Sequence, residues 1–258
     1  MSTLIIIPAR MGSTRFPGKP MAQIRGVPMI GHIYLRTKLA KTESEVCVAT
    51  CDKEIFDYIQ SIGGKAVMTS DAHERCTDRT KEALLKVEAE MGHKVDVVVM
   101  VQGDEPLVVP AMVDEVVSPL LQDSKCLVTN LIAPIHTEED FRSRNNVKIV
   151  FDKNMRALYC SREPIPSPLL AKKPYAKWKQ LGIIAFRRDF LIQYSELEPT
   201  PLEIIESVDM NRVLEHGYQI QLVPTQFELV SVDTKEDLEK ASARMASDEL
   251  FKSYEVSI

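Results

Sequence analysis

The chain has 258 residues, of which 45% are hydrophobic and 27% charged, and its formal net charge is −5. This balance is typical of a globular enzyme, and the acidic charge argues against a general binder of nucleic acid or anionic membranes, because both need a basic protein surface. No apolar run approaches the roughly 20 residues that cross a bilayer, and the N-terminus lacks a signal-peptide pattern, so we expect a cytoplasmic protein.

Short strands alternate with amphipathic helices through the first half of the chain. We expect strands at 3–7, 45–50, 65–68, 95–101 and 126–132, and helices at 29–40, 53–61, 79–91 and 111–121. Such alternation is typical of βαβ units, and continuously apolar strands indicate a parallel sheet that is covered on both faces. The sequence therefore predicts an α/β fold.

The first strand leads into PARMGSTRFPGKP at 8–20, a segment that contains three cations, Arg10, Arg15 and Lys19. Each of them alone is compatible with an ordinary solvated loop. Together they follow the carboxyl end of a strand, where open α/β sheets bind ligands, so the set indicates a site for a strongly anionic group such as a triphosphate. The segment matches neither the P-loop nor the dinucleotide fingerprint.

Two carboxylates follow apolar stretches elsewhere in the chain. Asp104 lies in QGDEP directly after the strand at 95–101, and Asp233 follows FELVSV. Carboxylates at the rim of a nucleotide site commonly hold magnesium against phosphate oxygens. The alternatives are a simple turn at Asp104 and a helix cap at Asp233 or Thr234.

The second half of the chain has a different pattern. Strands are expected at 147–151 and 156–161 with a turn between them, followed by a proline-rich loop and a strand at 180–186. A helix is expected over 203–216, then a strand near 218–224 and a last helix from about Thr234. The pattern indicates a smaller lobe packed against the first half. The five cysteines contain no CxxC, so neither a disulfide framework nor a zinc site is expected.

Nine motifs occur in colinear order over nearly the whole chain. They are IIIPARMGSTRFPGKP, GGKAVMT, HERCTDR, VQGDEP, NNVKIVFD, ALYCSREPIP, LGIIAFRRDFL, PLEIIE and SVDTKEDLE. In this combination the chain resembles the CMP-Kdo synthetase family, the 3-deoxy-manno-octulosonate cytidylyltransferases. The resemblance implies a Rossmann-like nucleotide-diphospho-sugar transferase fold, usually as a homodimer. It also implies transfer from CTP to a 3-deoxy-octulosonic acid, giving a CMP-sugar and pyrophosphate for lipopolysaccharide synthesis.

The resemblance also implies roles for individual residues. Within a single domain it assigns 1–135 to the nucleotide, 136–230 to the sugar and dimerisation, and 231–258 to a metal-ligand strand end and the last helix. Lys19, Arg10, Asp104 and Asp233 are the implied catalytic residues, and the two aspartates are the implied ligands of Mg²⁺. The implied nucleotide-binding residues are Pro8, Ala9, Arg10, Ser13, Arg15, Lys19, Thr77, Asp78 and Gln102. The implied sugar-binding residues are Gln102, Arg162, Gln180 and Asp209.

The chain departs from the family pattern at three places. Arg75 and Cys76 stand where the family has Ser and Gly, which leaves the geometry of cytosine recognition open. Gln180 replaces a usual His, and Asp209 replaces a usual Glu. An amide oxygen can accept a hydrogen bond from an ammonium that an imidazolium would repel, so a branch that accepts 8-amino-Kdo is one interpretation, and sequence drift without a change of substrate is the other.

Other functions remain as alternatives at this point. The sugar could be another ulosonic acid such as a sialic-acid-like sugar, or the chain could be a non-catalytic CMP-sugar binding protein, although the presence of Lys19, Asp104 and Asp233 favours an enzyme. A nicotinamide oxidoreductase is disfavoured because the GxGxxG fingerprint is missing.

Overall fold

The computed structural model describes residues 1–13 and 15–255. The chain forms two compact units, the first made of Met1–Asp114 and Glu228–Ile258, the second of Glu115–Phe227. The sequence places the corresponding boundaries after residues 135 and 230. The first of these differs because the strand that starts at Val128 pairs with strands of the second unit. No helix among the described residues is both long and apolar enough to cross a membrane.

The first unit contains four of the five strands that the sequence predicts for a parallel sheet, while the fifth, expected at 126–132, lies in the second unit and pairs antiparallel with 177–187. The four parallel strands of the first unit, in spatial order, are β6 (Val97–Val101), β1 (Thr3–Ala9), β4 (Ser44–Thr50) and β5 (Lys65–Met68). All residues of β1 and β6 are buried, since helices cover both faces. β1 includes Pro8 and Ala9, so the segment with the three cations begins at the very end of a central strand.

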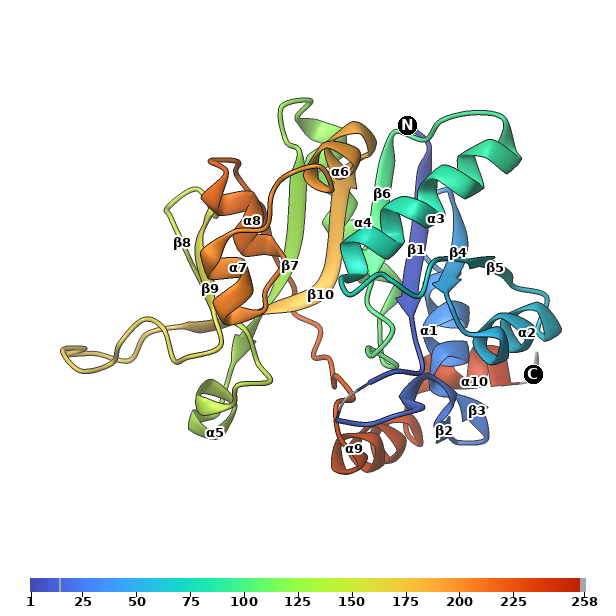
Figure 1. Ribbon diagram of the computed structural model, residues 1–258. Helices are drawn as coiled ribbons and strands as arrows, with labels where there is room; N and C mark the ends of the chain where they lie inside the picture. Colours follow the sequence, from blue (N-terminus) through green and yellow to red (C-terminus); the bar gives the residue numbers. More distant parts are fainter. Residues whose placement is uncertain (14, 256–258) are drawn as a thin grey trace. The chain divides into compact units, whose positions relative to one another are not determined.

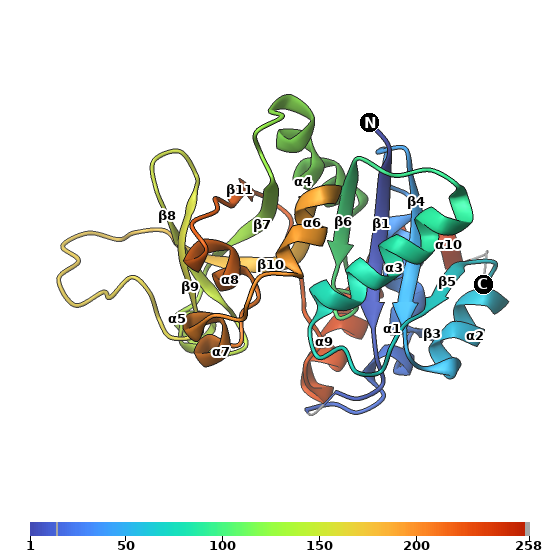
Figure 2. The same cartoon turned by 45° about the horizontal axis from the view of Figure 1, so that its top comes forward.

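Helices flank this sheet on both faces (Figure 1). α1 (Met29–Thr37) connects β1 to β4, and α2 (Lys53–Ser61) connects β4 to β5, so both connections run in the same direction across the sheet. α3 (Cys76–Met91) connects β5 back to β6 in the opposite direction, and because such connections are right-handed it lies on the opposite face. Figure 2 shows α3 in front of β1 and β4. The predicted helices at 29–40, 53–61 and 79–91 are confirmed, although α3 begins at Cys76, earlier than expected.

The C-terminal helices α9 (Lys235–Met245) and α10 (Glu249–Glu255) return to the first unit. α10 contacts α1 through the Tyr254 hydroxyl, which lies 2.8 Å from His32 Nδ1, and Asp248, the residue before α10, pairs with Arg36 of α1 at 2.8 Å. A short hairpin of β2 (Gln23–Ile24) and β3 (Val27–Pro28) precedes α1.

The second unit is mainly antiparallel. β7 (Val128–Ile135) pairs antiparallel with β10 (Lys177–Arg187) and parallel with β11 (Gln221–Pro224). β8 (Lys148–Phe151) and β9 (Ala157–Ser161) form the predicted hairpin, and β8 also pairs with β10. The connecting helices are α5 (Glu138–Arg142), α6 (Arg188–Tyr194), α7 (Pro201–Glu206) and α8 (Met210–Glu215). α4 (Pro110–Gln122) contains the junction between the units.

The prediction of one continuous helix over 203–216 is wrong. Thr200 and Glu203 form a capping box that starts α7 at Pro201, and Ser207 ends it in a left-handed conformation with φ 51° and ψ 52°. α8 then begins at Met210. Asp209 is therefore the N-cap residue of α8, in the short connection between the two helices.

Candidate functional site

The segment from Arg10 to Lys19, called the basic loop here, is folded around the backbone of Met11. The Met11 carbonyl accepts from the backbone N–H of Ser13 at 2.8 Å and of Gly18 at 2.9 Å. The Met11 N–H donates to the carboxylate of Asp52 at 2.8 Å. Gly18 has φ 75°, a conformation that a side chain would strain. Bonds of the Met11 backbone thus hold the described part of the loop in place.

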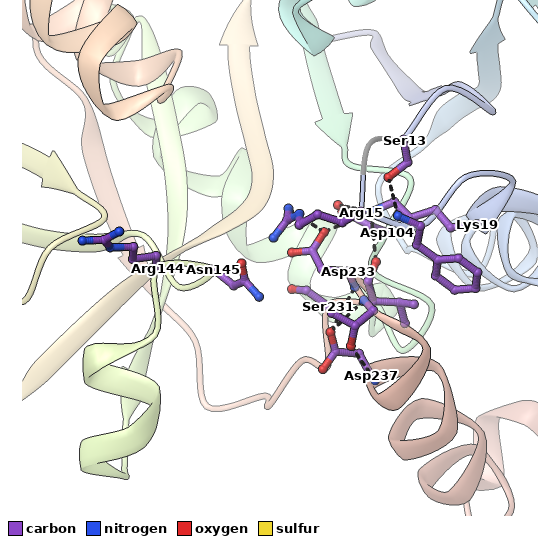
Figure 3. Close-up of polar contacts among 12 residues, drawn as sticks. Ser13, Arg15, Lys19, Asp104, Arg144, Asn145, Ser231, Asp233 and Asp237 are labelled. Carbon is purple, nitrogen blue, oxygen red and sulfur yellow. Dashed lines mark hydrogen bonds and ion pairs between the residues drawn. The ribbon is translucent and has the colours of Figure 1, made fainter.

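Lys19 is the centre of an ionic cluster at the end of this loop (Figure 3). Its Nζ lies 3.1 Å from Asp104 Oδ2, 3.2 Å from Asp233 Oδ1 and 2.9 Å from the carbonyl oxygen of Val232. Arg15 Nη2 lies 2.9 Å from the same Asp233 oxygen. Burial alone would lower the pKa of Lys19, but the charges and hydrogen bonds of the two aspartates outweigh it and raise that pKa. Lys19 is therefore cationic at neutral pH.

A main-chain bond brings the two aspartates together. The N–H of Val232 donates to the carbonyl of Asp104 at 2.9 Å, which joins the stretch before α9 to the end of β6. The N-cap of α9 is Thr234, whose hydroxyl accepts from the N–H of Asp237, while the Asp237 carboxylate accepts from the N–H of Asp233 and of Thr234. The Asp233 side chain is consequently not the helix cap, and it faces Lys19 and Arg15 instead.

These two carboxylates fit a magnesium ion. Asp104 Oδ1 is buried and has no hydrogen-bond partner among the described residues, so this oxygen is oriented for a ligand that the protein does not supply. Over residues 1–13 and 15–255, which the structure describes, no group of three or more His, Cys, Asp or Glu side chains is placed to hold a metal ion. Proteins usually bind Mg²⁺ through one or two carboxylates, and water and substrate phosphates supply the remaining ligands. A site with two carboxylates is therefore sufficient.

The remaining expected nucleotide-binding residues all lie in the first unit. Pro8 and Ala9 end β1, and Gln102 follows β6, the strand next to β1. Gly103 lets the chain after β6 lie close to the end of β1, since a Cβ at Gly103 would lie only 2.8 Å from the carbonyl oxygen of Pro8. Arg10 is exposed, and the Ser13 hydroxyl accepts from the N–H of Phe16 at 3.4 Å.

Thr77 and Asp78 lie in the first turn of α3, with Thr77 fully buried. Cys76 is the first residue of that helix and is not among the described residues with positive φ. The replacement of the family's glycine at this position therefore needs no unusual backbone geometry, because a cysteine adopts helical angles without strain.

The expected sugar-binding residues Arg162, Gln180 and Asp209 all lie in the second unit. The Arg162 guanidinium donates to the carbonyl oxygens of Glu206 at 2.7 Å, Arg144 at 2.9 Å and Ser207 at 3.2 Å. Gln180 lies on β10, and its backbone N–H donates to the Val147 carbonyl at 2.9 Å.

Three residues that contact the expected site segments were not predicted from the sequence. Asp52 accepts from the Met11 N–H, Lys148 donates to the Arg162 carbonyl, and the Glu206 carboxylate accepts from the Arg162 N–H. Asp52 could have been found, because it follows β4, the neighbour of β1 in the parallel sheet, just as Asp104 follows β6. Lys148 and Glu206 gave no such signal. A lysine at the start of an expected strand and a glutamate inside an expected helix both resemble ordinary surface residues.

Comparison with known proteins gives a consistent result. A family model described as cytidylyltransferase matches residues 4–221. A 3-deoxy-manno-octulosonate cytidylyltransferase of Geotalea daltonii is 43% identical over 255 residues, covering 95% of this chain and 98% of the relative. One of Acaryochloris marina is 42% identical over 241 residues, covering 93% of this chain and 96% of the relative.

Solved structures agree with the sequence relatives. A CMP:2-keto-3-deoxy-manno-octonic acid synthetase, complexed with CTP, matches with a TM-score of 0.87 at 38% identity and covers 95% of this chain and 99% of its own. A 4-diphosphocytidyl-2C-methyl-D-erythritol synthase from Anaerococcus prevotii matches with a TM-score of 0.60 at 15% identity over 95% of this chain and 98% of its own, which shows the fold alone. The predicted Rossmann-like nucleotidyltransferase fold is confirmed.

Proposed function

This chain belongs to the family of 3-deoxy-manno-octulosonate cytidylyltransferases, and on that premise we propose that it joins CTP to a 3-deoxy-octulosonic acid, giving the CMP-sugar and pyrophosphate. The observation that carries the proposal is the cluster of Lys19 and Arg15 with Asp104 and Asp233 at the end of the parallel sheet. The matched structure that is complexed with CTP supports the choice of nucleotide.

The two cations of the cluster suit a triphosphate. Both cations contact carboxylate oxygens. Phosphate oxygens are also negatively charged acceptors, so Lys19 and Arg15 can donate to a bound triphosphate in place of the carboxylates. In nucleotidyl transfer the negative charge grows on the departing pyrophosphate. Cations that are already positioned there stabilise the transition state without reorganisation.

Asp104 and Asp233 are the proposed ligands of Mg²⁺. A bound magnesium ion supplies positive charge that polarises phosphate oxygens and lowers the pKa of the attacking sugar hydroxyl. The protein's own contribution is to fix the two carboxylates on rigid supports, one at the end of β6 and one directly before α9. The bond between Val232 and Asp104 sets their separation.

The residues that we propose to contact the sugar in the second unit are Arg162, Gln180 and Asp209. Among the 3-deoxy-octulosonic acids, the replacement of the usual His by Gln180 favours 8-amino-Kdo, because an amide oxygen accepts a hydrogen bond from an ammonium that an imidazolium would repel, and the Asp209 carboxylate is a second acceptor. Kdo itself is the other candidate, and the names of the relatives support it. The product would serve lipopolysaccharide synthesis, as the family resemblance implies.

A homodimer formed through the second unit is part of the proposal. α7 exposes two adjacent aliphatic side chains, Ile204 by 61% and Ile205 by 76%, and contiguous exposed apolar surface is typical of protein–protein interaction sites. A second copy of the chain is the expected cover. Light scattering at several protein concentrations should give the dimer mass, and a monomer at all of them would exclude this assembly.

A pyrophosphate-release assay tests the function directly. The enzyme would be given CTP and magnesium with Kdo, with 8-amino-Kdo or with sialic acid, and a reaction without sugar is the control for CTP hydrolysis. We expect release with at least one octulosonic acid and little with sialic acid. Absence of release with both octulosonic acids would contradict the proposal, and activity confined to sialic acid would move the chain to a different substrate class.

A further inference from the structure

Lys148 is a lysine whose side chain is completely buried, with 0% exposure. Its Nζ donates to the carbonyl oxygens of Asn146 at 2.7 Å and Ser143 at 2.9 Å, and to that of Arg162. An ammonium has three hydrogens, so three main-chain carbonyls satisfy it fully. Burial lowers the pKa of Lys148, while the nearby carboxylates of Glu163 and Glu206 act in the opposite direction. Burying a charged group costs free energy unless hydrogen bonds satisfy it, and here main-chain carbonyls supply those bonds.

The carbonyls that Lys148 contacts belong to two separate segments. Ser143 and Asn146 lie in the turn 143–147 before β8, and Arg162 follows the end of β9. The Arg162 guanidinium returns to the same turn by donating to the Arg144 carbonyl. The turn and the strand end are thus tied in both directions.

The same turn supports Gln180. The carbonyl of Val147, the last residue of the turn, accepts from the backbone N–H of Gln180 on β10 at 2.9 Å. Two of the three residues proposed for the sugar in this unit are therefore bonded to a turn that Lys148 anchors, Gln180 through its backbone N–H and Arg162 through its guanidinium.

Glu206 completes the arrangement on the other side of Arg162. Its carboxylate accepts from the Arg162 N–H at 2.7 Å, the Tyr159 hydroxyl at 2.7 Å and the Ser161 hydroxyl at 2.8 Å. Burial alone would raise the pKa of Glu206, but these bonds outweigh it and lower that pKa. The carbonyls of Glu206 and Ser207 in turn accept from the Arg162 side chain, directly before Asp209.

We propose that Lys148 is a positioning residue for the sugar: its ammonium fixes the 143–147 turn against Arg162 and so sets the placement of Arg162 and Gln180. This inference rests on the proposed function, because it assigns those residues to the sugar. A lysine suits the task better than a neutral residue, since no neutral side chain brings three donors on one atom to three carbonyls. An apolar replacement would leave those carbonyls buried and unsatisfied.

The test is steady-state kinetics of Lys148→Met and Lys148→Gln, with CTP and the sugar varied separately. Lys153→Met is the matched control, because Lys153 is an exposed lysine in the turn between β8 and β9. We expect kcat/KM for the sugar to fall about 10- to 100-fold in Lys148→Met, the scale of misplacing a substrate-positioning group. KM for CTP should stay within about twofold, Lys148→Gln should fall in between because it keeps two donors, and Lys153→Met should match the wild type.

The outcomes separate this inference from the proposed function. A wild-type enzyme that releases no pyrophosphate with either octulosonic acid contradicts the proposed function before any variant is made. If the wild type is active and kcat/KM falls equally for CTP and the sugar in the Lys148 variants, or falls for neither, the positioning role is overturned. If both variants fail to fold, as judged by circular dichroism and CTP calorimetry, Lys148 serves stability alone and the proposal is likewise overturned.

Discussion

Two regions of the molecule hold cations in opposite ways. At the end of the basic loop, Lys19 and Arg15 contact the carboxylates of Asp104 and Asp233. In the Lys148 cluster, which comprises Lys148, Arg162, Glu206 and the turn 143–147, the cationic groups donate to main-chain carbonyls. Apart from the bond from Lys19 to the Val232 carbonyl, the cations of the first region contact carboxylate side chains, whereas those of the second contact the backbone.

The difference indicates which contacts a ligand can replace. A carboxylate that faces an ammonium can accept a metal ion instead, and the ammonium can take a phosphate oxygen, so both groups keep a partner when substrate arrives. A main-chain carbonyl that loses its buried donor has no such replacement and is left unsatisfied. We therefore expect substitutions in the first region to change chemistry and nucleotide binding, and those in the second to change the shape of the proposed sugar site.

The largest effect is expected from Asp104→Asn and Asp233→Asn. Each removes a negative charge at nearly constant size, and turnover should fall by about 10²- to 10³-fold, the cost of losing a preorganised group that acts on transition-state charge. Pyrophosphate release at saturating CTP and magnesium measures it, with Asp57→Asn on the surface of α2 as the control. Near-normal turnover in either variant would place the metal elsewhere.

A comparable effect, on stability and not on chemistry, is expected for His32, a buried group that is held neutral. Burial lowers its pKa to about 4, far below the usual 6.5. The unfolded chain therefore takes up a proton first as pH falls. The stability that the neutral ring contributes is complete above about pH 6.5 and is lost between that value and about 4, by at most about 3 kcal/mol.

Urea unfolding at pH 7, 5.5 and 4.5 checks this dependence. His32→Gln should be less stable at pH 7, because the contacts to Tyr254 and to the Ile24 carbonyl are altered, but its stability should vary less over the same range. His93→Gln, which changes an exposed histidine, should keep the wild-type dependence. Equal slopes for the wild type and His32→Gln would assign the acid sensitivity to other groups.

A smaller loss is expected when the cations of the first region are removed. Lys19→Ala and Arg15→Ala should weaken CTP about 10- to 100-fold, because a hydrogen bond to a charged group contributes about 1.5–3 kcal/mol. CMP should be affected much less, since it lacks the outer phosphates. Isothermal calorimetry with both nucleotides decides the matter, and equal losses for CTP and CMP would remove these cations from the triphosphate site.

The smallest effect concerns the choice of sugar. Gln180→His replaces an acceptor by a ring that becomes cationic near neutral pH, so preference should shift toward Kdo and away from 8-amino-Kdo by roughly 1–2 kcal/mol. The shift should increase as pH falls from 8 to 6. The measurement is kcat/KM for both sugars with both enzymes, and a constant ratio would exclude Gln180 as a specificity residue.

The sequence predicted the first region better than the second for a physical reason. Asp104 follows a continuously apolar strand, and parallel strands bring their carboxyl ends to one edge, so Asp104 and the basic loop could be placed together before the structure was known. Asp233 was predicted as a second ligand, but capping by Asp233 remained an alternative until the bonds of Thr234 and Asp237 were seen.

The second region depends on contacts that have no sequence period. The end of α7 at Ser207 arises from a left-handed residue that is neither Gly nor Asn, and its carbonyl accepts from Arg162, which is 45 residues away in the sequence. The half-buried carboxylate of Glu206 likewise accepts from residues 159–162, and Lys148 joins the turn before its strand to the Arg162 carbonyl. Propensity and apolar periodicity report neither kind of contact.

The bond between the Val232 N–H and the Asp104 carbonyl has a consequence for how this enzyme can be altered. Main-chain bonds are indifferent to side-chain identity, so a library randomised at 104 and 233 would vary the ligand atoms while the separation of the two backbones stayed constant. Only proline at position 232 would delete the donor. If Asp104 and Asp233 hold the proposed metal ion, the two positions can be varied as a pair to alter metal preference while the backbone between them is kept.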